Sequence, residues 1–362
     1  MLTHLTESSK HLPRHNHIHI DTSNSYTTLF IPQTKLYCDR LPPPPLRHDS
    51  TNTPLKPKPA LHIRTIQPKG IPGVYAYYTG RTGTHFHPDA DWHDQTLALG
   101  VATYAIISGD EALLFDAGLA SAHASFMLDH VTSLGATKIT TVLSHYHSDH
   151  VAGASALRAT RIVASAGTKR KLADERAGLE RGDDGPAFEV VFPSQTYEES
   201  LALRIGERRI ELRNVNVHTA DSTVGFLPDE GVLLAGDTLE DTCTYVSEAE
   251  NLAAHVEELE RLKELPIRRI LPAHGCPDKI AAGGYDATLV DATIRYLRAV
   301  DEGVEKPAAW GEKLGDVVKG DLDAGRLVYW GEYEGVHEEN VEYVKEVREE
   351  AREVGEKIND AR

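Results

Sequence analysis

Three histidines and an aspartate lie within six residues of this chain, in the segment SHYHSDH at residues 144–150. The segment directly follows residues 139–143, an apolar and β-branched run whose length is typical of a buried strand. Imidazole and carboxylate groups are the ligands that zinc and similar divalent ions prefer. The pattern predicts a catalytic metal site at a strand end. A polar loop that is His-rich by chance is the alternative, but few structural needs would crowd four such side chains together.

Polar residues that can bind metal also follow three later predicted strands. These residues are His218, Asp237 and His274. Strand ends on one edge of a sheet converge in space, so we expect the three side chains to meet the residues of the SHYHSDH segment. Taken alone, His218 or His274 would be a core histidine with no metal. Their regular placement after strands favours a shared site instead.

The elements that must position these residues alternate between strands and helices. Predicted strands lie at 73–78, 99–108, 112–115, 139–143, 161–165, 201–205, 209–217, 223–227, 232–235 and 269–271. Predicted helices lie at 120–134, 151–157, 247–264, 286–300 and 340–358, with a helix and a variable loop within 167–200. A loop at 82–95, rich in His, Asp and Trp, either lines the site or is an unrelated surface loop. Strands that are apolar on both faces predict sheets covered by helices.

Five motifs in order resemble those of the metallo-β-lactamase-fold hydrolases, over about residues 70–300. The motifs are Phe-Asp116-Ala-Gly, HxHxDH at 145–150, His218, Ala-Gly-Asp237-Thr and Pro-Ala-His274-Gly. One HxHxDH could arise by chance, whereas five motifs in the family's order are a specific signal. The resemblance implies an α/β (α+β) fold, an αββα sandwich with a dinuclear metal site at one edge.

The same resemblance implies a role for each residue of the motifs. One metal would be held by His145, His147 and His218, and the other by Asp149, His150 and His274. Asp237 would bridge the two metals. We expect Asp116 to orient a ligand histidine and not to bind metal itself. The implied cofactors are two divalent ions, with Zn²⁺ as the default for His-rich ligands and Mn²⁺ or Fe²⁺ as alternatives.

The expected activity is the metal-dependent hydrolysis of a small ester, lactone or thioester. A hydroxide that bridges the two metals would be the nucleophile. Asp149 would orient the hydroxide and pass a proton to the leaving group, which makes it a catalytic residue as well as a ligand. Tyr245 is a candidate oxyanion donor and Tyr285 a weaker one. For both tyrosines the alternative is a packed aromatic ring with a surface hydroxyl.

The motifs of this chain differ from those of some branches of the family, and these differences narrow the range of expected activities. The true metallo-β-lactamases generally lack a bridging aspartate at the position of Asp237, so β-lactam hydrolysis is expected at most as a side activity. Hydroxyacylglutathione hydrolases share Asp237 but usually carry a second Gly-His after the residue that corresponds to His218. Lactonases share the whole ligand set and are the preferred relatives. A mononuclear iron oxidoreductase of the persulfide dioxygenase type and a non-catalytic binding protein stay open as alternatives.

Composition sets limits on partners and compartment. The chain has 38 Lys and Arg against 55 Asp and Glu, a formal net charge of −17. This balance argues against nucleic acids and anionic membranes as partners and leaves a small-molecule substrate. The three cysteines, Cys38, Cys243 and Cys276, do not suggest a disulfide framework, so we expect a cytoplasmic protein. No stretch approaches the roughly 20 apolar residues of a membrane span, and no secretory signal is evident.

Three segments are expected along the chain. Residues 1–60 form a His- and Pro-rich arm with little predicted structure and a weak likeness to a transit peptide. Residues 61–304 form the catalytic domain, and residues 305–362 a helical extension. The amphipathic pattern at 340–358 predicts a helix that packs on its own domain, with a lid or a homodimer contact as the alternative.

Overall fold

The computed structural model of the chain describes residues 62–81, 92–183, 185–303 and 310–360. The arm expected at residues 1–60 and most of the loop expected at 82–95 lie outside these ranges. None of the described helices is both long enough and apolar enough to cross a membrane.

Seven strands of the described chain form one mixed sheet, in the order β1-β2-β3-β4-β5-β6-β7. The strands are β1 (Arg64–Ile66), β2 (Val74–Thr79), β3 (Val101–Ser108), β4 (Glu111–Phe115), β5 (Lys138–Leu143), β6 (Arg161–Ser165) and β7 (Gln195–Tyr197). Pairing is antiparallel from β1 to β4 and parallel from β4 to β7. Because β4 and β5 run parallel, the residues that follow them meet at one edge of the sheet.

A second sheet of five described strands has the order β12-β11-β10-β9-β8. Its strands are β8 (Ser200–Ile205), β9 (Arg208–Asn214), β10 (Thr223–Leu227), β11 (Val232–Gly236) and β12 (Arg269–Pro272). Only the pair of β11 and β12 is parallel among these strands. Their carboxyl ends therefore also share an edge, which carries Asp237 and His274.

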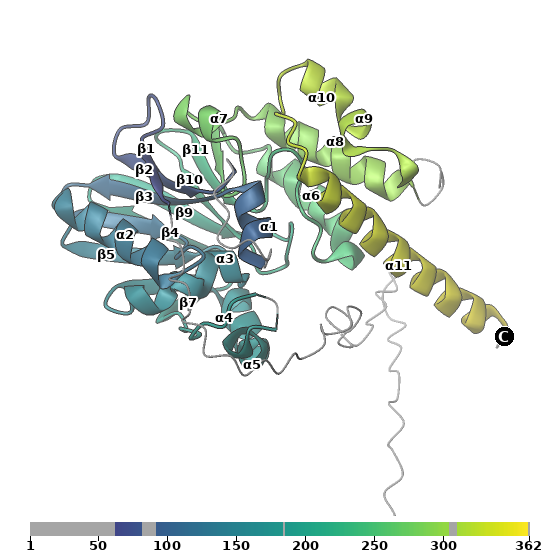
Figure 1. The fold of residues 1–362 in the computed structure, drawn as a ribbon, viewed down its shortest axis with the longest axis horizontal. Helices are drawn as coiled ribbons and strands as arrows, with labels where there is room; N and C mark the ends of the chain where they lie inside the picture. The colour runs from purple at the N-terminus through teal and green to yellow at the C-terminus, as the bar shows by residue number, and fades with distance from the viewer. Residues whose placement is uncertain (1–61, 82–91, 184, 304–309, 361–362) are drawn as a thin grey trace, which may run out of the picture. The chain divides into compact units, whose positions relative to one another are not determined.

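Helices cover the outer faces of both sheets (Figure 1). The helices are α1 (Trp92–Leu99), α2 (Ser121–Ser133), α3 (Ser148–Val151), η1 (Ala152–Leu157), α4 (Ala166–Asp174), α5 (Arg176–Arg181), η2 (Ala249–Asn251), α6 (Leu252–Leu262), α7 (Pro277–Ala281), α8 (Thr288–Glu302), α9 (Leu314–Val317), α10 (Lys319–Asp323) and α11 (Tyr333–Asp360), where η marks a 3₁₀ helix. Helices α2, α4 and α5 pack on the first sheet, whereas α6, α8 and α11 pack over the second.

The two sheets face each other across a shared apolar core. Buried side chains such as Tyr104 and Phe115 from the first sheet belong to the same cluster as Ile210 and Leu234 from the second. Burial of this apolar surface from both sheets stabilises their stacking. The layers are thus helix, sheet, sheet and helix, so the predicted αββα sandwich is confirmed.

Most predicted elements agree with the structure, but the region before β3 was predicted wrongly. Residues 92–95 were expected in a loop and 99–100 in a strand, whereas α1 spans Trp92–Leu99 and β3 begins at Val101. The helix is anchored by Leu97, which is buried with Val101 and Leu119. Gly100 then takes φ +82°, a left-handed conformation that ends a helix at low cost.

Other corrections concern the ends of elements and two strands that were not predicted, β1 and β7, and the strand expected at 209–217 ends at Asn214. Residues 152–157 form a 3₁₀ helix, and the end of the segment expected as a variable loop contains β7. Helix α11 begins at Tyr333, seven residues before its predicted start at residue 340. Tyr333 and His337 are buried, and their contacts extend the helix beyond the amphipathic pattern. Tertiary contacts here outweigh local sequence preference.

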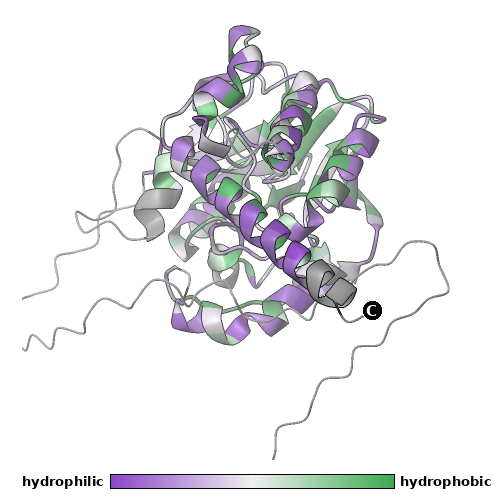
Figure 2. Cartoon of the chain, turned by 90° about the vertical axis from the view of Figure 1, so that its right-hand side faces the viewer, coloured by the Kyte–Doolittle hydropathy of each residue, from purple (hydrophilic) through white to green (hydrophobic). Residues whose placement is uncertain are grey.

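The N-terminal half of α11 packs on its own domain. Tyr333, Val341 and Val344 join the apolar cluster that includes α6 and α8. In Figure 2, most of the α11 ribbon has the hydrophilic colour. Asn340 lies on the buried side with no exposed surface. Its Oδ1 accepts from Val246 N at 2.7 Å, and its Nδ2 donates to Thr244 O and to Tyr296 Oη, each at 2.9 Å.

Replacing Asn340 should therefore destabilise the fold. Asn340→Ala removes three hydrogen bonds and leaves a buried N–H and a buried carbonyl unpaired, which should lower the free energy of unfolding by about 3 kcal/mol. Chemical denaturation measures this change. Glu349→Ala, at an exposed position of the same helix, is the control and should change it by less than about 0.5 kcal/mol. A loss below about 1 kcal/mol in Asn340→Ala would contradict the packing described here.

Candidate metal centre

The seven residues expected to bind metal come together at one edge of the sandwich. Their ligand atoms form two groups, and within each group these atoms lie within 4.8 Å of one another. The groups are His145, His147, His218 and Asp237, and Asp149, His150, Asp237 and His274. Asp237 is common to both groups, which is the arrangement that the family resemblance implied. His147 and Asp149 are only partly buried, whereas the other five residues are buried.

The chain reaches this edge from both sheets. The segment SHYHSDH leaves β5 and enters α3, and Thr223 N at the start of β10 donates to Ser144 O at 2.8 Å. Asp237 follows the end of β11, and Ala273 N at the end of β12 donates to Gly236 O at 2.9 Å. These backbone contacts join the strand ends, so the ligand side chains are placed by the sheets and not by long free loops.

One carboxylate oxygen, Asp237 Oδ2, lies at the centre of the histidines. Its distances to their Nε2 atoms are 3.2 Å for His150, 3.4 Å for His274, and 3.7 Å for both His145 and His218. The other oxygen, Oδ1, is buried without a hydrogen-bond partner in the described part of the chain. A single carboxylate that touches both groups is suited to bridging two cations.

In three of these histidines, the ring nitrogen that points away from the site, Nδ1, faces a hydrogen-bond acceptor of the protein. Nδ1 of His150 faces Asp116 Oδ2 at 2.9 Å, Nδ1 of His218 donates to Tyr245 O at 2.9 Å, and Nδ1 of His274 donates to Gly100 O at 2.7 Å. An N–H at Nδ1 leaves the lone pair of Nε2 directed into the site. This arrangement fixes both the tautomer and the ring orientation that a metal ligand needs.

Asp116 is the residue that joins several of these contacts. It directly follows β4, has φ +70°, and its carboxylate accepts from Ser144 N at 2.7 Å and from Ser144 Oγ at 2.9 Å. Aspartate tolerates this left-handed conformation better than most residues do. The carboxylate thus contacts both His150 and the start of the SHYHSDH segment, and its role in orienting a metal ligand stays a prediction.

Unpartnered buried atoms indicate that the site fits a cation. His145 Nε2, His150 Nε2 and Asp237 Oδ1 are buried, and none has a hydrogen-bond partner within the described residues. Buried polar atoms are nearly always satisfied, so three such atoms at one point call for a ligand. Imidazole nitrogens and carboxylate oxygens suit zinc or a similar divalent ion, so these residues could hold metal.

The histidines of the first group are kept neutral. Burial, reinforced by neighbouring histidines, lowers the pKa of His145 and brings that of His147 to about 3. Burial also lowers the pKa of His218. His147 Nδ1 lies 2.9 Å from His218 Nε2. Neutral rings with converging nitrogens are in the protonation state that binds metal.

The second group balances opposite charges. Burial opposes ionisation of His150 and His274, but nearby carboxylates, Asp237 above all, outweigh it and raise the pKa of both histidines. Reciprocally, His150 and His274 outweigh burial and hold the pKa of Asp149 and Asp237 below the usual range. The paired charges compensate each other at the point where a divalent cation would fit.

The two tyrosines singled out in the sequence have different surroundings. Tyr245 contacts the site through its carbonyl, and its hydroxyl donates to Tyr343 Oη at 3.2 Å. Its ring centroid lies 6.0 Å from that of His218, and a role as oxyanion donor stays a prediction. Tyr285 is a packed aromatic, but the expected surface hydroxyl is wrong: the residue is buried and its hydroxyl donates to Asp241 Oδ2 at 2.5 Å.

Glu240 is a site residue that the sequence did not indicate. Its Oε1 accepts from Tyr245 N at 2.9 Å, and its Oε2 accepts from Tyr333 Oη at 3.1 Å. Burial, together with the charge of Asp237, raises the pKa of Glu240 to about 8. The contact fixes the loop that carries the Tyr245 carbonyl. No local pattern signals this role, because the partner Tyr333 lies 93 residues away.

Asp221 is a second residue that was missed, three positions after His218. It is buried, and neither carboxylate oxygen has a hydrogen-bond partner within the described residues. Burial raises the pKa of Asp221 to about 6. Nearby, Glu248 accepts from Ala220 N at 2.8 Å and pairs with Lys171 at 3.0 Å. Burial therefore destabilises the ionised form of Asp221.

Comparison with known proteins supports a family assignment. Residues 97–274 match the sequence model of the Metallo-beta-lactamase superfamily. The chain is similar to the Beta-lactamase-like protein 2 homolog of Drosophila melanogaster, with 29% identity over 183 residues, and to that of Caenorhabditis elegans, with 27% over 192 residues. Each match covers 49% of this chain, and 59% and 56% of the respective relatives. The chain thus spans less than two thirds of the length of these curated relatives.

A solved structure shows the same fold. The metallo-beta-lactamase from Pontibacter korlensis superposes with a TM-score of 0.50 at 18% sequence identity. The match covers 66% of this chain and 99% of that one. At this level of identity the likeness concerns the fold alone. The remaining third of the chain includes segments that the bacterial protein does not share.

The contact between Asp116 and His150 predicts a defined loss of metal affinity. Asp116→Asn tolerates the left-handed backbone and keeps an oxygen for Ser144 N, but its amide replaces the carboxylate that faces His150 Nδ1. The affinity for metal at the group of Asp149, His150 and His274 should fall by about 10–100-fold. Competition with a chromophoric chelator measures it. Asp110→Asn, in the exposed β3–β4 turn, is the control, and equal affinities in both variants would refute the role of Asp116.

The burial of Asp221 predicts a pH-dependent change in stability. Because its folded-state pKa is raised, its ionised form destabilises the fold, increasingly as the pH rises from about 4 to above 6. Asp221→Asn has no carboxyl group to ionise. The difference in unfolding free energy, variant minus wild type, should therefore be about 1.5 kcal/mol more positive at pH 8 than at pH 5. Denaturation at both pH values measures the difference. Asp229→Asn, an exposed turn residue, should show none, and a pH-independent effect of Asp221→Asn would contradict the assignment.

Proposed function

Because residues 97–274 match the sequence model of the metallo-beta-lactamase superfamily, we propose that this chain is a metal-dependent hydrolase with two divalent ions. Its proposed substrates are small esters, lactones or thioesters. The observation that carries the proposal is the position of Asp237, whose carboxylate belongs to two complete groups of ligand atoms. Each group combines imidazole nitrogens with carboxylate oxygen, the set that suits zinc.

The side chains of the site have different proposed roles in the reaction. When bound, two divalent ions would supply Lewis acidity and lower the pKa of water. The partly exposed His147 and Asp149 mark the side from which substrate approaches. Asp149 Oδ2 lies 3.2 Å from His274 Nε2 and 3.4 Å from His150 Nε2, which holds the carboxylate at the solvent side of the second group. There Asp149 would orient the attacking water, hold its proton and pass it to the leaving group.

The substrate class follows from the chemistry that such a site favours. Esters, lactones and thioesters share an electrophilic carbonyl that attack by an activated water can open. Tyr245 is proposed as an oxyanion donor after release of its hydroxyl from Tyr343, with which it bonds at 3.2 Å. β-Lactam hydrolysis is proposed only as a side activity.

Two complete groups of ligand atoms favour a pair of metals over one. A mononuclear iron oxidoreductase would leave the second group, with Asp149 and His274, without a metal to bind. Yet Asp116 and Gly100 hold the ring orientations of His150 and His274 in that group. Two such orienting contacts are hard to explain unless both histidines are ligands.

The proposal predicts about two divalent ions per chain and an activity that depends on them. Elemental analysis of the purified protein measures the ions, and a panel of lactones, thioesters, aryl esters and β-lactams, run with and without chelator, measures activity. Asp237→Ala should lose one or both ions and lower kcat by at least about 100-fold. Asp229→Ala, which removes an exposed carboxylate outside the site, is the control.

Three outcomes would count against this function. Full esterase activity in Asp237→Ala would exclude the shared carboxylate from the reaction. Absence of bound metal after purification without chelator would exclude a metal enzyme. A single tightly bound iron, with oxygen consumption in the presence of a persulfide, would favour the oxidoreductase instead.

A further inference from the structure

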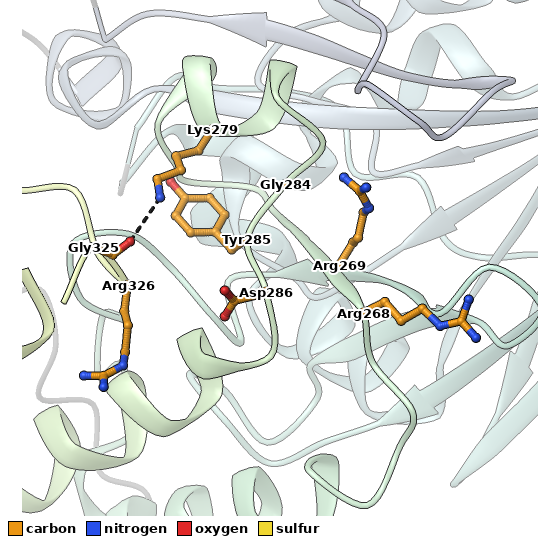
Figure 3. Close-up of a pocket in the computed structure, with 8 residues that line it drawn as sticks. All are labelled: Arg268, Arg269, Lys279, Gly284, Tyr285, Asp286, Gly325 and Arg326. Carbon is orange, nitrogen blue, oxygen red and sulfur yellow. Dashed lines mark hydrogen bonds between the residues drawn. The ribbon is translucent and has the colours of Figure 1, made fainter.

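A basic cavity lies outside the candidate metal centre, where the start of β12 meets the segment after α10 (Figure 3). Its volume is about 390 Å³, and none of the seven candidate metal ligands lines it. Its lining residues are Arg268, Arg269, Lys279, Gly284, Tyr285, Asp286, Gly325 and Arg326. A cavity of this size is within the range of pockets that hold small organic ligands.

The cavity concentrates positive charge in an acidic protein. Four of its lining side chains are cationic and one is anionic, although the chain has a formal net charge of −17. Within the described residues, the guanidinium of Arg268 makes no ion pair or hydrogen bond. In the described part of the chain, Arg269 and Lys279 donate only to backbone carbonyls, those of Lys69 and Gly283 for Arg269 and that of Gly325 for Lys279. Among the described residues, Arg268, Arg269 and Lys279 thus make no ion pair with a carboxylate, so an anion in the cavity would find unpaired cations.

The fourth cation, Arg326, is only partly neutralised. Its guanidinium lies 2.8 Å from Asp321 Oδ1, but Asp321 also pairs with Arg295. In Figure 3, Lys279 lies beside the Tyr285 ring, and the side chains of Arg268 and Arg326 extend outward on opposite sides of Asp286. An anion that enters the cavity would thus meet positive charge contributed by separate elements of the fold.

Asp286 adds a requirement for hydrogen-bond donors on the ligand. Its Oδ1 accepts from Thr288 N at 2.8 Å and from Thr288 Oγ1 at 2.5 Å, whereas Oδ2 has no hydrogen bond within the described residues. A carboxylate repels a bare phosphate but accepts from hydroxyl groups. The buried Tyr285 ring has Lys279 over its face, with Nζ 5.9 Å from the ring centroid.

We propose that this cavity binds a small organic phosphate that carries hydroxyl groups. The phosphate group would bind Lys279, Arg268 and Arg269, and a hydroxyl group would donate to Asp286. Phosphate contacts with lysine and arginine are charge-assisted and strong for their size. A recess, unlike an extended basic stripe, favours a compact ligand over a polymer. This binding site is independent of the proposed hydrolase activity.

Titration calorimetry with glucose 6-phosphate on the full, metal-loaded chain tests the proposal. The test variant is Arg268→Gln/Lys279→Gln, which spares Arg269 because that side chain also holds the carbonyls of Lys69 and Gly283. The control, Arg298→Gln/Lys319→Gln, removes the same charge from exposed ion pairs that do not line the cavity. The Kd should rise at least about tenfold in the test variant and stay within about twofold in the control.

Further titrations separate the sources of binding. Glucose alone should bind undetectably, and inorganic phosphate should bind more weakly than glucose 6-phosphate. Thermal unfolding of each variant verifies folding, and the single variant Lys279→Gln replaces the double variant if that one is unfolded.

Several results would overturn the proposal. The first is the absence of saturable binding at millimolar ligand. The second is an equal loss of affinity in the control variant, and the third is inorganic phosphate that binds as tightly as the sugar phosphate. Binding that survives in the cavity variant but is lost in His274→Ala would place the ligand at the metal centre. Tighter binding of a single-stranded oligonucleotide would indicate that the cavity binds a nucleic acid and not a small ligand.

Discussion

The rest of the site depends on one buried carboxylate, that of Asp237. Four histidine Nε2 atoms lie within 3.2–3.7 Å of its Oδ2, and its Oδ1 is buried without a partner in the described chain. Removal of an ionised carboxylate from water is costly unless charge and hydrogen bonds compensate it. Each side chain around it must therefore be held in place and in a suitable protonation state. The surrounding contacts, from Asp116, Gly100 and the Tyr245 carbonyl, serve this need.

The fold meets the constraint by joining strand ends from two sheets. Parallel pairing of β4 with β5, and of β11 with β12, places Asp116 beside Ser144 and Asp237 near His274. Two residues at this edge, Asp116 and His218, have φ near +70°, a conformation that costs about 1–3 kcal/mol outside glycine. Such strain persists because strong local contacts fix both residues. It lets Asp116 turn into the site directly after β4, and His218 four residues after the end of β9.

Much of this arrangement could be predicted from the sequence, because strand periodicity and ligand chemistry are local signals. The αββα layers and the convergence of His218, Asp237 and His274 on the SHYHSDH segment follow from residues placed directly after apolar runs. Other features depend on partners far along the chain. Glu240 is fixed by Tyr333, and α1 is set by burial of Leu97, so neither has a local pattern. Asp221 was overlooked because a buried carboxylate without partners looks like an ordinary polar residue in a sequence.

Residues that lie outside the region matched by the family model also contact and stabilise the site. The matched region ends at residue 274, yet Tyr333, Asn340 and Tyr343 of α11 hold the loop from Glu240 to Val246. That loop carries the carbonyl that orients His218. Without α11, the buried Glu240 would lose one of its two partners and Val246 N would lose its acceptor. A helix outside the shared domain thus helps set the geometry of a ligand inside it. The buried side of α11 therefore makes the C-terminal helix part of the candidate metal centre's supporting structure.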